Sequence, residues 1–236
     1  MKSIEFSLNC VESGYNIIIM AKYPIFLELG GRRAVIVGGG AVATRKAQTL
    51  LAAGARLVVV SKTIDDALTA LCQGANAELV KSGYSKNYIA GAVLVIAATS
   101  DEQLNKRIYK DCQELEILCN VVDAPELSDF ITPAVVKRGD LQVAICTEGH
   151  CPAYAGHLRK KLEQIITIQH GEFLVELEMV RKRIFKDMPS TADRKTLIGQ
   201  LADDKSFEYF LQKGPEAWRD YAQEIRQDYL SNVKVQ

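Results

Sequence analysis

Short apolar runs alternate with helical patterns from about residue 24 to residue 122. The runs are rich in β-branched and aliphatic residues, and the run over 92–98 is almost continuously apolar, as in a strand buried on both faces. Between the runs, apolar residues recur every three or four positions, which predicts amphipathic helices. The β-α-β-α-β order predicts an α/β fold with a Rossmann-like, doubly wound parallel sheet. The predicted strands are 34–37, 57–60, 79–80, 92–98 and 117–122, with helices from about 42, 64 and 104.

The pattern changes after Pro133. Two short apolar segments, 134–137 and 141–145, flank Arg138-Gly139-Asp140 and predict a β-hairpin. Pro152 then opens a predicted helix to about residue 167, since proline is favoured in the first helical turn. The rest is charged and helical in character, and its apolar stripes predict an all-helical core. The stripes are Phe173, Leu174, Leu177, Val180 and Ile184, then Trp218, Tyr221, Ala222 and Ile225.

Four parts follow from these changes of pattern: an N-terminal extension over 1–22, a dinucleotide-binding domain over 23–132, a small β-β-α segment over 133–168 and a helical domain over 169–236. The sequence from Met20 onward resembles the N-terminus of a protein, so we expect residues 1–19 to have little structural role. The alternative, that this stretch packs as a strand or helix, stays open. Its apolar run Ile17–Met20 is too short for a signal peptide.

Composition narrows the class of protein. The 236 residues carry 29 Lys and Arg against 29 Asp and Glu, a formal net charge of +0, which argues against a general nucleic-acid binder. No apolar run approaches the roughly 18–20 residues of a membrane span. The six cysteines are scattered without a CxxC pair, which favours reduced thiols and a cytoplasmic protein.

The strongest chemical signal is a glycine-rich loop between the first predicted strand and the first predicted helix, where phosphates of a dinucleotide bind in Rossmann folds. Gly38 is expected to make the tight turn, and Gly40 is expected to let the backbone approach a pyrophosphate. Ala43 is expected to let the helix pack closely on the sheet. The start of the helix then offers free N–H groups to the phosphates. The predicted cofactor residues here are Gly38, Gly39, Gly40, Ala41 and Val42.

The acidic residue that usually binds the ribose at the end of the second strand is missing, because that strand ends in Val60-Ser61-Lys62. Ser61 is a candidate for the ribose contact, and Lys62 for a 2′-phosphate, so the choice between NAD and NADP stays open. Asp123 follows the last predicted strand of the sheet, at the carboxyl end where ligands of such sheets bind. It is a candidate proton-transfer group, with a turn-capping aspartate as the alternative.

All three histidines fall within residues 150–170, and two of them lie near two cysteines. Imidazole and thiolate suit a transition metal, but the spacing matches no standard zinc pattern, and we predict no metal site. The alternatives are a solvated basic helix face and a site for a polycarboxylate. The basic residues at 181–183 leave the same two alternatives open. The cysteines and histidines are Cys146, His150, Cys151 and His157.

Longer stretches carry a family resemblance. YPIFLELGGRRAVIVGGGAVATRKAQTLLAAGARLVVVS, AATSDEQLN and CNVVDAPELSDFITPAVVKRGDLQVAICTEGHCPAYAGHLRKKLE resemble the precorrin-2 dehydrogenase family, the dehydrogenase module of siroheme synthase. The resemblance covers residues 23–170 closely and the helical tail loosely. In the loop before Pro152, the family's usual serine is Cys151 and its first glycine is Glu148, so no role is carried over to that loop.

The resemblance implies NAD-dependent oxidation of precorrin-2 to sirohydrochlorin in siroheme biosynthesis, by a homodimer joined through the β-β-α segment. In some members ferrous iron insertion follows, which is left open for this chain. By motif position, Asp123 is the implied acid/base, and Gly38, Gly40, Val42 and the region of Thr99 match cofactor contacts of the family. Asn120, three residues before Asp123, is also predicted as a cofactor residue. The competing hypothesis is a non-catalytic domain that senses a dinucleotide.

Overall fold

The computed structural model describes residues 22–233, so the predictions for residues 1–19 and for most of the 1–22 extension lie outside the described residues. The chain divides into two compact units between Val93 and Leu94. The strands follow the order β3-β2-β1-β4-β5 in one sheet, with a separate two-stranded β6-β7 sheet. The pairs β1–β2, β2–β3 and β4–β5 are parallel. This is the doubly wound architecture that the alternating pattern predicts.

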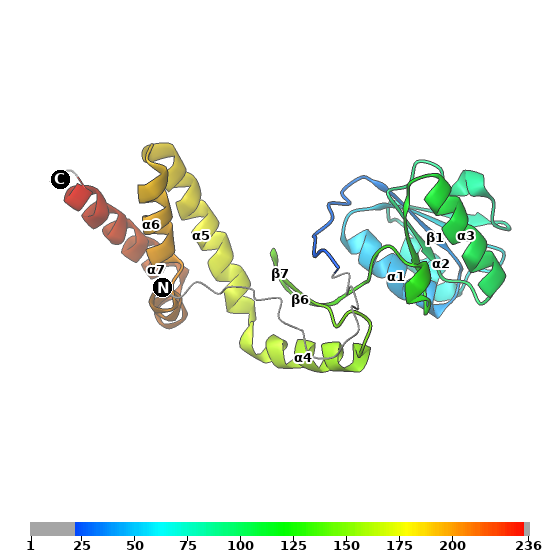
Figure 1. The fold of residues 1–236 in the computed structure, drawn as a ribbon. Coiled ribbons are helices and arrows are strands. Elements are labelled where there is room, and N and C mark those ends of the chain that lie inside the picture. The colour runs from blue at the N-terminus through cyan, green and yellow to red at the C-terminus, as the bar shows by residue number, and fades with distance from the viewer. Residues whose placement is uncertain (1–21, 234–236) are drawn as a thin grey trace, which may run out of the picture. The chain divides into compact units, whose positions relative to one another are not determined.

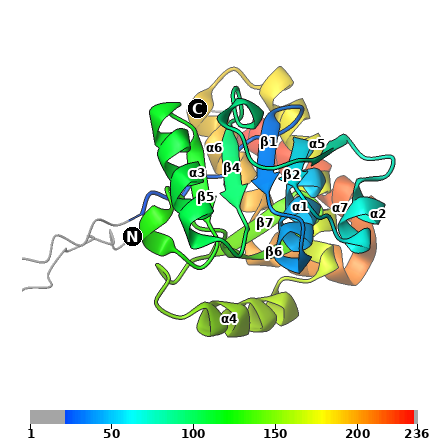
Figure 2. The ribbon, with the colours of Figure 1, turned by 90° about the vertical axis from the view of Figure 1, so that its right-hand side faces the viewer.

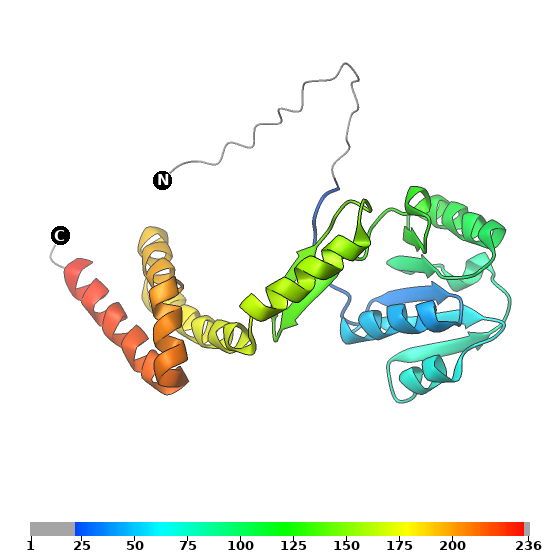
Figure 3. The same cartoon turned by 90° about the horizontal axis from the view of Figure 1, so that it is seen from below.

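The first unit holds β1 (Arg33–Val37), β2 (Arg56–Ser61) and β3 (Ala77–Lys81), with the 3-10 turn Lys86–Tyr88 after them. Helix α1 (Ala41–Ala52) lies alongside β1 and β2, as Figure 3 shows, and α2 (Asp66–Cys72) is the shorter helix. The central strands are buried because both their faces are apolar, and α1 packs with its small residues inward. These residues are Ala43 and Ala47, with Leu50 one turn later.

The second unit begins with β4 (Leu94–Ala97), α3 (Glu102–Glu114) and β5 (Leu118–Val121). Asp101 caps α3 by accepting a hydrogen bond from the Leu104 N–H at 3.0 Å. Helix α3 lies along β4 and β5 (Figure 2) and buries Ile108 and Cys112. The 3-10 turn Pro125–Leu127 follows β5.

The hairpin of β6 (Ala134–Arg138) and β7 (Leu141–Ile145) turns at Gly139, whose φ of 58° suits glycine. Arg138, expected in the turn, is the last residue of β6 and pairs with Leu141. Its guanidinium donates to the carbonyl oxygens of Glu163 and Ile166 at 3.2 and 2.9 Å. These bonds satisfy the end of α4 (Pro152–Ile165), which stops before the predicted residue 167.

Helices α5 (Ile168–Asp187), α6 (Thr191–Leu201) and α7 (Asp204–Val233) form the tail (Figure 1). Their apolar stripes meet in one core around Trp218, which confirms the core predicted for this region. Gly214 has φ 82° and ψ 174° before Pro215, so α7 consists of two helices joined at a break. The core residues are Phe173, Ile184, Met188, Leu197, Leu201, Phe210, Trp218 and Ala222.

Candidate functional site

The glycine loop lies where the sequence places it, between the end of β1 and the start of α1. Gly38 has φ 129°, a conformation that only glycine adopts easily, and its N–H donates to the Val60 carbonyl at 2.9 Å. The chain thus leaves β1 through a tight turn held against the end of β2. This confirms the turn-forming role predicted for Gly38.

Gly39 is the glycine with the least space around it. A Cβ at Gly39 would lie 2.0 Å from the Thr63 carbonyl oxygen and 3.0 Å from the Ile64 Cα. The Gly39 carbonyl also accepts the Asp65 N–H at 2.9 Å. Gly39 therefore joins the glycine loop to the segment that follows β2, a packing role that its place in the motif does not reveal.

Gly40 has open space where a ligand could approach. Among residues 22–233, a Cβ there would have one neighbour within 4 Å, an Asp65 carboxylate oxygen at 4.0 Å. Gly40 is the N-cap of α1 and supplies no side-chain cap, and the first turn of α1 carries no acidic residue. The first N–H groups of α1 are therefore open to an anion, and the backbone at Gly40, Ala41 and Val42 is exposed. This local geometry fits the pyrophosphate of a dinucleotide.

The neighbouring strand ends at Ser61, which is half-buried. Its hydroxyl oxygen lies 3.0 Å from where a Gly39 Cβ would be, so the side chain faces the glycine loop. Lys62 is exposed, with its Cε directed to Gly83, 3.5 Å from the position of a Cβ there. Ser61 is thus adjacent to the loop, and both residues remain predictions as ribose or 2′-phosphate contacts.

In the second unit, Thr99 follows β4 and Asn120 lies within β5. The Thr99 hydroxyl donates to Asn105 Oδ1 at 2.7 Å and accepts the Asp101 N–H at 3.2 Å, so it organises the start of α3. The Asn120 amide donates to the Phe130 carbonyl at 2.9 Å. Both side chains hold local turns here, and their predicted role as cofactor contacts stays a prediction.

Asp123 follows β5 in an exposed turn and has φ 60°. A left-handed backbone is uncommon for a residue with a side chain, although Asp and Asn tolerate it best. The turn is held without the Asp123 carboxylate, because the Ser128 hydroxyl accepts the Val121 N–H at 3.0 Å and donates to the Ala124 carbonyl at 3.0 Å. The exposed carboxylate of Asp123 is therefore available to exchange a proton with a bound molecule.

The cysteines and histidines near residue 150 separate into different roles. Within residues 22–233, no three His, Cys, Asp or Glu side chains are arranged to hold a metal ion. His157 stacks with Tyr154, with ring centroids 6.3 Å apart. His170 accepts the Thr167 N–H at 3.1 Å in a capping box at the start of α5, which is a structural role.

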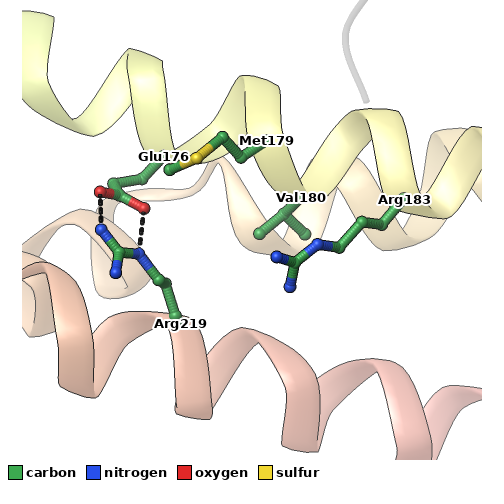
Figure 4. Close-up of a pocket in the computed structure, with 5 residues that line it drawn as sticks. All are labelled: Glu176, Met179, Val180, Arg183 and Arg219. Atoms are coloured by element: carbon green, nitrogen blue, oxygen red, sulfur yellow. Dashed lines mark hydrogen bonds and ion pairs between the residues drawn. The ribbon is translucent and has the colours of Figure 1, made fainter.

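The helical tail carries an open groove that the sequence patterns do not indicate (Figure 4). Glu176, with 9% of its side chain exposed, accepts two 2.7 Å hydrogen bonds from Arg219, and this bidentate pair raises the pKa of Arg219. Met179 and Val180 form the apolar wall, and Arg183 completes the lining. The signal that could have found Glu176 is its place three residues after Phe173, on the buried face of α5.

The basic residues at 181–183 differ from one another. The Arg181 guanidinium lies 4.7 Å from the centre of the Phe185 ring, and Lys182 forms a 2.7 Å ion pair with Glu178. Arg183 alone lines the groove. Two of the three cations therefore have partners on their own helix, as expected for a solvated helix face.

Known proteins match both the sequence and the fold. Residues 25–134 match a family described as "Putative NAD(P)-binding". Siroheme synthase of Thioalkalivibrio sulfidiphilus is 36% identical over 198 residues, which cover 84% of this chain and 40% of that protein. Siroheme synthase of an Escherichia coli strain is 36% identical over 182 residues, 77% of this chain and 40% of that protein.

A solved structure of SirC, a precorrin-2 dehydrogenase, has a TM-score of 0.70 and 22% identity, and the match covers 86% of this chain and 100% of that one. The Rossmann-like fold with its helical tail is therefore shared. No helix among residues 22–233 is long and apolar enough to cross a membrane. The chain spans about two fifths of the siroheme synthases that it matches. Over most of its own length the chain is similar to siroheme synthase, as the resemblance predicts.

Proposed function

We propose that this protein oxidises precorrin-2 to sirohydrochlorin with NAD, a step of siroheme biosynthesis, in the cytoplasm. The observation that carries the proposal is the uncapped start of α1 at Gly40, which offers free N–H groups and open space to a pyrophosphate. The identity to siroheme synthases supplies the substrate class. The five described cysteines are all free, which suits a reducing compartment.

The cofactor, the glycine loop and Asp123 have different roles in the proposed reaction. NAD, when bound, accepts the hydride that leaves the macrocycle. Gly38 and Gly39 fix the loop, and Gly40 leaves room for the phosphates beside the first turn of α1. Asp123 is proposed to take the proton that must also leave the substrate, since its carboxylate is exposed and is not needed to hold its turn.

We also propose that the protein is a homodimer joined through the segment 133–168. In the hairpin only Val136 is buried, and Val135 remains 38% exposed. Tyr154 on α4 is 55% exposed. A two-stranded hairpin is marginal in water, and a twofold mate would cover these apolar side chains.

The decisive experiment combines the purified chain with precorrin-2 and either NAD or NADP, and follows sirohydrochlorin absorbance. We expect colour formation that requires the chain and NAD. If authentic substrate and NAD give no colour change while NAD still binds, the protein is a dinucleotide sensor instead. The same assay with sirohydrochlorin and ferrous iron tests the chelatase activity that the resemblance also implies.

Asp123→Asn tests the proton-transfer role, because asparagine tolerates the left-handed turn but is not an acid. We expect the rate of dehydrogenation to fall about 10²–10⁴-fold, with NAD affinity unchanged. Glu126→Gln is the matched control, since Glu126 is an exposed acid in the same loop. Near-normal turnover of Asp123→Asn would show that this aspartate only shapes its turn.

A further inference from the structure

The loop between β7 and α4 reverses the chain through a tight turn. Glu148 has φ 54° and Gly149 has φ 87°, and the His150 N–H donates to the Thr147 carbonyl at 2.8 Å. These are the φ angles of a type I′ turn, whose two central residues both have positive φ. This turn type joins adjacent antiparallel strands in hairpins.

Two cysteines flank this turn symmetrically. Cys146 precedes Thr147, and Cys151 follows His150 with an extended φ of −153°. In a regular hairpin with a two-residue turn, the Cα atoms of the pair next to the closing residues lie about 4.5 Å apart. Here the turn joins the end of β7 at Ile145 to the start of α4 at Pro152. A disulfide needs Cα atoms roughly 4.4–6.8 Å apart. The closed turn places the two cysteines on its two arms, each one residue beyond the hydrogen-bonded Thr147 and His150.

Both cysteines are accessible, and the Cys146 thiol lies beside the turn. Cys146 and Cys151 are both exposed, and the Cys146 sulfur accepts the Glu148 N–H at 3.3 Å, which holds it beside the turn. The other described cysteines are buried. A hydrogen bond with Cys112, followed by burial, raises the pKa of the Cys119 thiol, and burial raises the pKa of Cys72. These three thiols are poor competitors for an oxidant in solution.

We propose that Cys146 and Cys151 form a reversible redox site that closes to a disulfide when it meets a small-molecule disulfide. One thiolate attacks the external disulfide, forms a mixed disulfide and releases one small thiol. The second cysteine then attacks the mixed disulfide, forms the Cys146–Cys151 bond and releases a second small thiol. The protein dithiol loses two electrons and two protons, and the external disulfide becomes two thiols. The site goes beyond the proposed dehydrogenase activity and does not depend on it.

The test uses the full chain with Cys10→Ser, so that the cysteine outside the described residues cannot react. The protein is treated with oxidised glutathione, alkylated and weighed intact. We expect the main species to have lost two hydrogens, with at most a minor glutathione adduct, and a peptide cross-link between Cys146 and Cys151. Closure within one chain has an effective concentration of about 1 mM or more, so at about 0.1 mM reduced glutathione the closed form should exceed the mixed disulfide about tenfold.

The matched controls are Cys146→Ser and Cys151→Ser in the same background, each expected to retain the glutathione adduct. Gly149→Ala keeps both thiols but places a Cβ at positive φ in open space, and closure should slow about tenfold. A persistent adduct in the parent, an intermolecular disulfide, or no reaction of these two thiols would each overturn the proposal.

Discussion

The parallel sheet and the β6–β7 hairpin bury their strands in different ways. In β1, β2 and β4, all residues but the first or last are buried, whereas β6 has one buried residue and β7 has none. The inner strands β1, β2 and β4 are apolar on both faces and are covered within the chain, whereas the edge strand β3 has no buried residue. The hairpin strands alternate between half-buried and exposed residues. The hairpin has no such cover from strands on either side, and it is the region for which we propose a partner.

The largest expected effect tests the sheet. Gly39→Ala would force a Cβ against the backbone at Thr63, only 2.0 Å away, and the loop cannot yield without breaking the Gly39–Asp65 hydrogen bond. We expect a loss of at least about 3 kcal/mol in the free energy of unfolding, measured by urea titration.

Gly40→Asp is the paired variant, since a Cβ there meets nothing closer than 4.0 Å. Gly40→Asp should leave the urea midpoint almost unchanged. It should abolish NAD binding in calorimetry, because the new carboxylate occupies the place of the phosphates and repels their negative charge. Wild-type NAD affinity in Gly40→Asp would contradict the assignment of this loop.

The next effect tests the hairpin. Val135→Asp replaces an exposed apolar side chain of β6 by a charge, and we expect the dimer Kd to rise by about 30-fold or more, measured by sedimentation equilibrium. Leu115→Asp is the matched control, because Leu115 is 37% exposed and lies outside the segment 133–168. A monomeric parent protein at micromolar concentration, or equal effects of both changes, would refute the dimer proposal.

A smaller effect concerns the helical tail, which is held by its own core and by the Glu176–Arg219 pair. Arg219→Lys cannot form two parallel hydrogen bonds to Glu176, and we expect Tm to fall by about 2–4 °C. Lys182→Ala removes the exposed pair with Glu178 and should change Tm by less than about 1 °C. Equal shifts would show that the buried position of Glu176 adds nothing.

The smallest expected effect is a change in how the free energy of unfolding depends on pH. The Tyr229 hydroxyl donates to Asp193 at 2.9 Å, and this bond, with burial, raises the pKa of Tyr229. The folded state therefore holds the tyrosine proton more tightly than the unfolded state does. The resulting stability is present below the ordinary tyrosine pKa of about 10 and is lost as pH rises through the folded value. Stability should fall more steeply above pH about 10 in the parent than in Tyr229→Phe; parallel curves would contradict this.

The sequence alone determined the order of elements and the chemistry of the glycine loop. Periodicity and glycine placement are local properties, so they located every strand of the sheet and the tight turn at Gly38. The ends of the strands were predicted less exactly. The apolar run over 92–98, for example, forms a strand only from Leu94 to Ala97. Pro215 interrupts the helical pattern of the tail in the sequence, and the structure has the break at the residue before it, Gly214.

Tertiary structure alone decided the features that join residues distant in sequence. The contact of Gly39 with Thr63 and the pairing of Glu176 with Arg219 depend on how the chain returns after 24 and 43 residues. The position of Arg138 at the end of α4 likewise depends on the hairpin packing against that helix. Sequence patterns report which face of an element is apolar, but hydrogen bonds and steric limits depend on which surfaces meet, and that is set only when the chain folds.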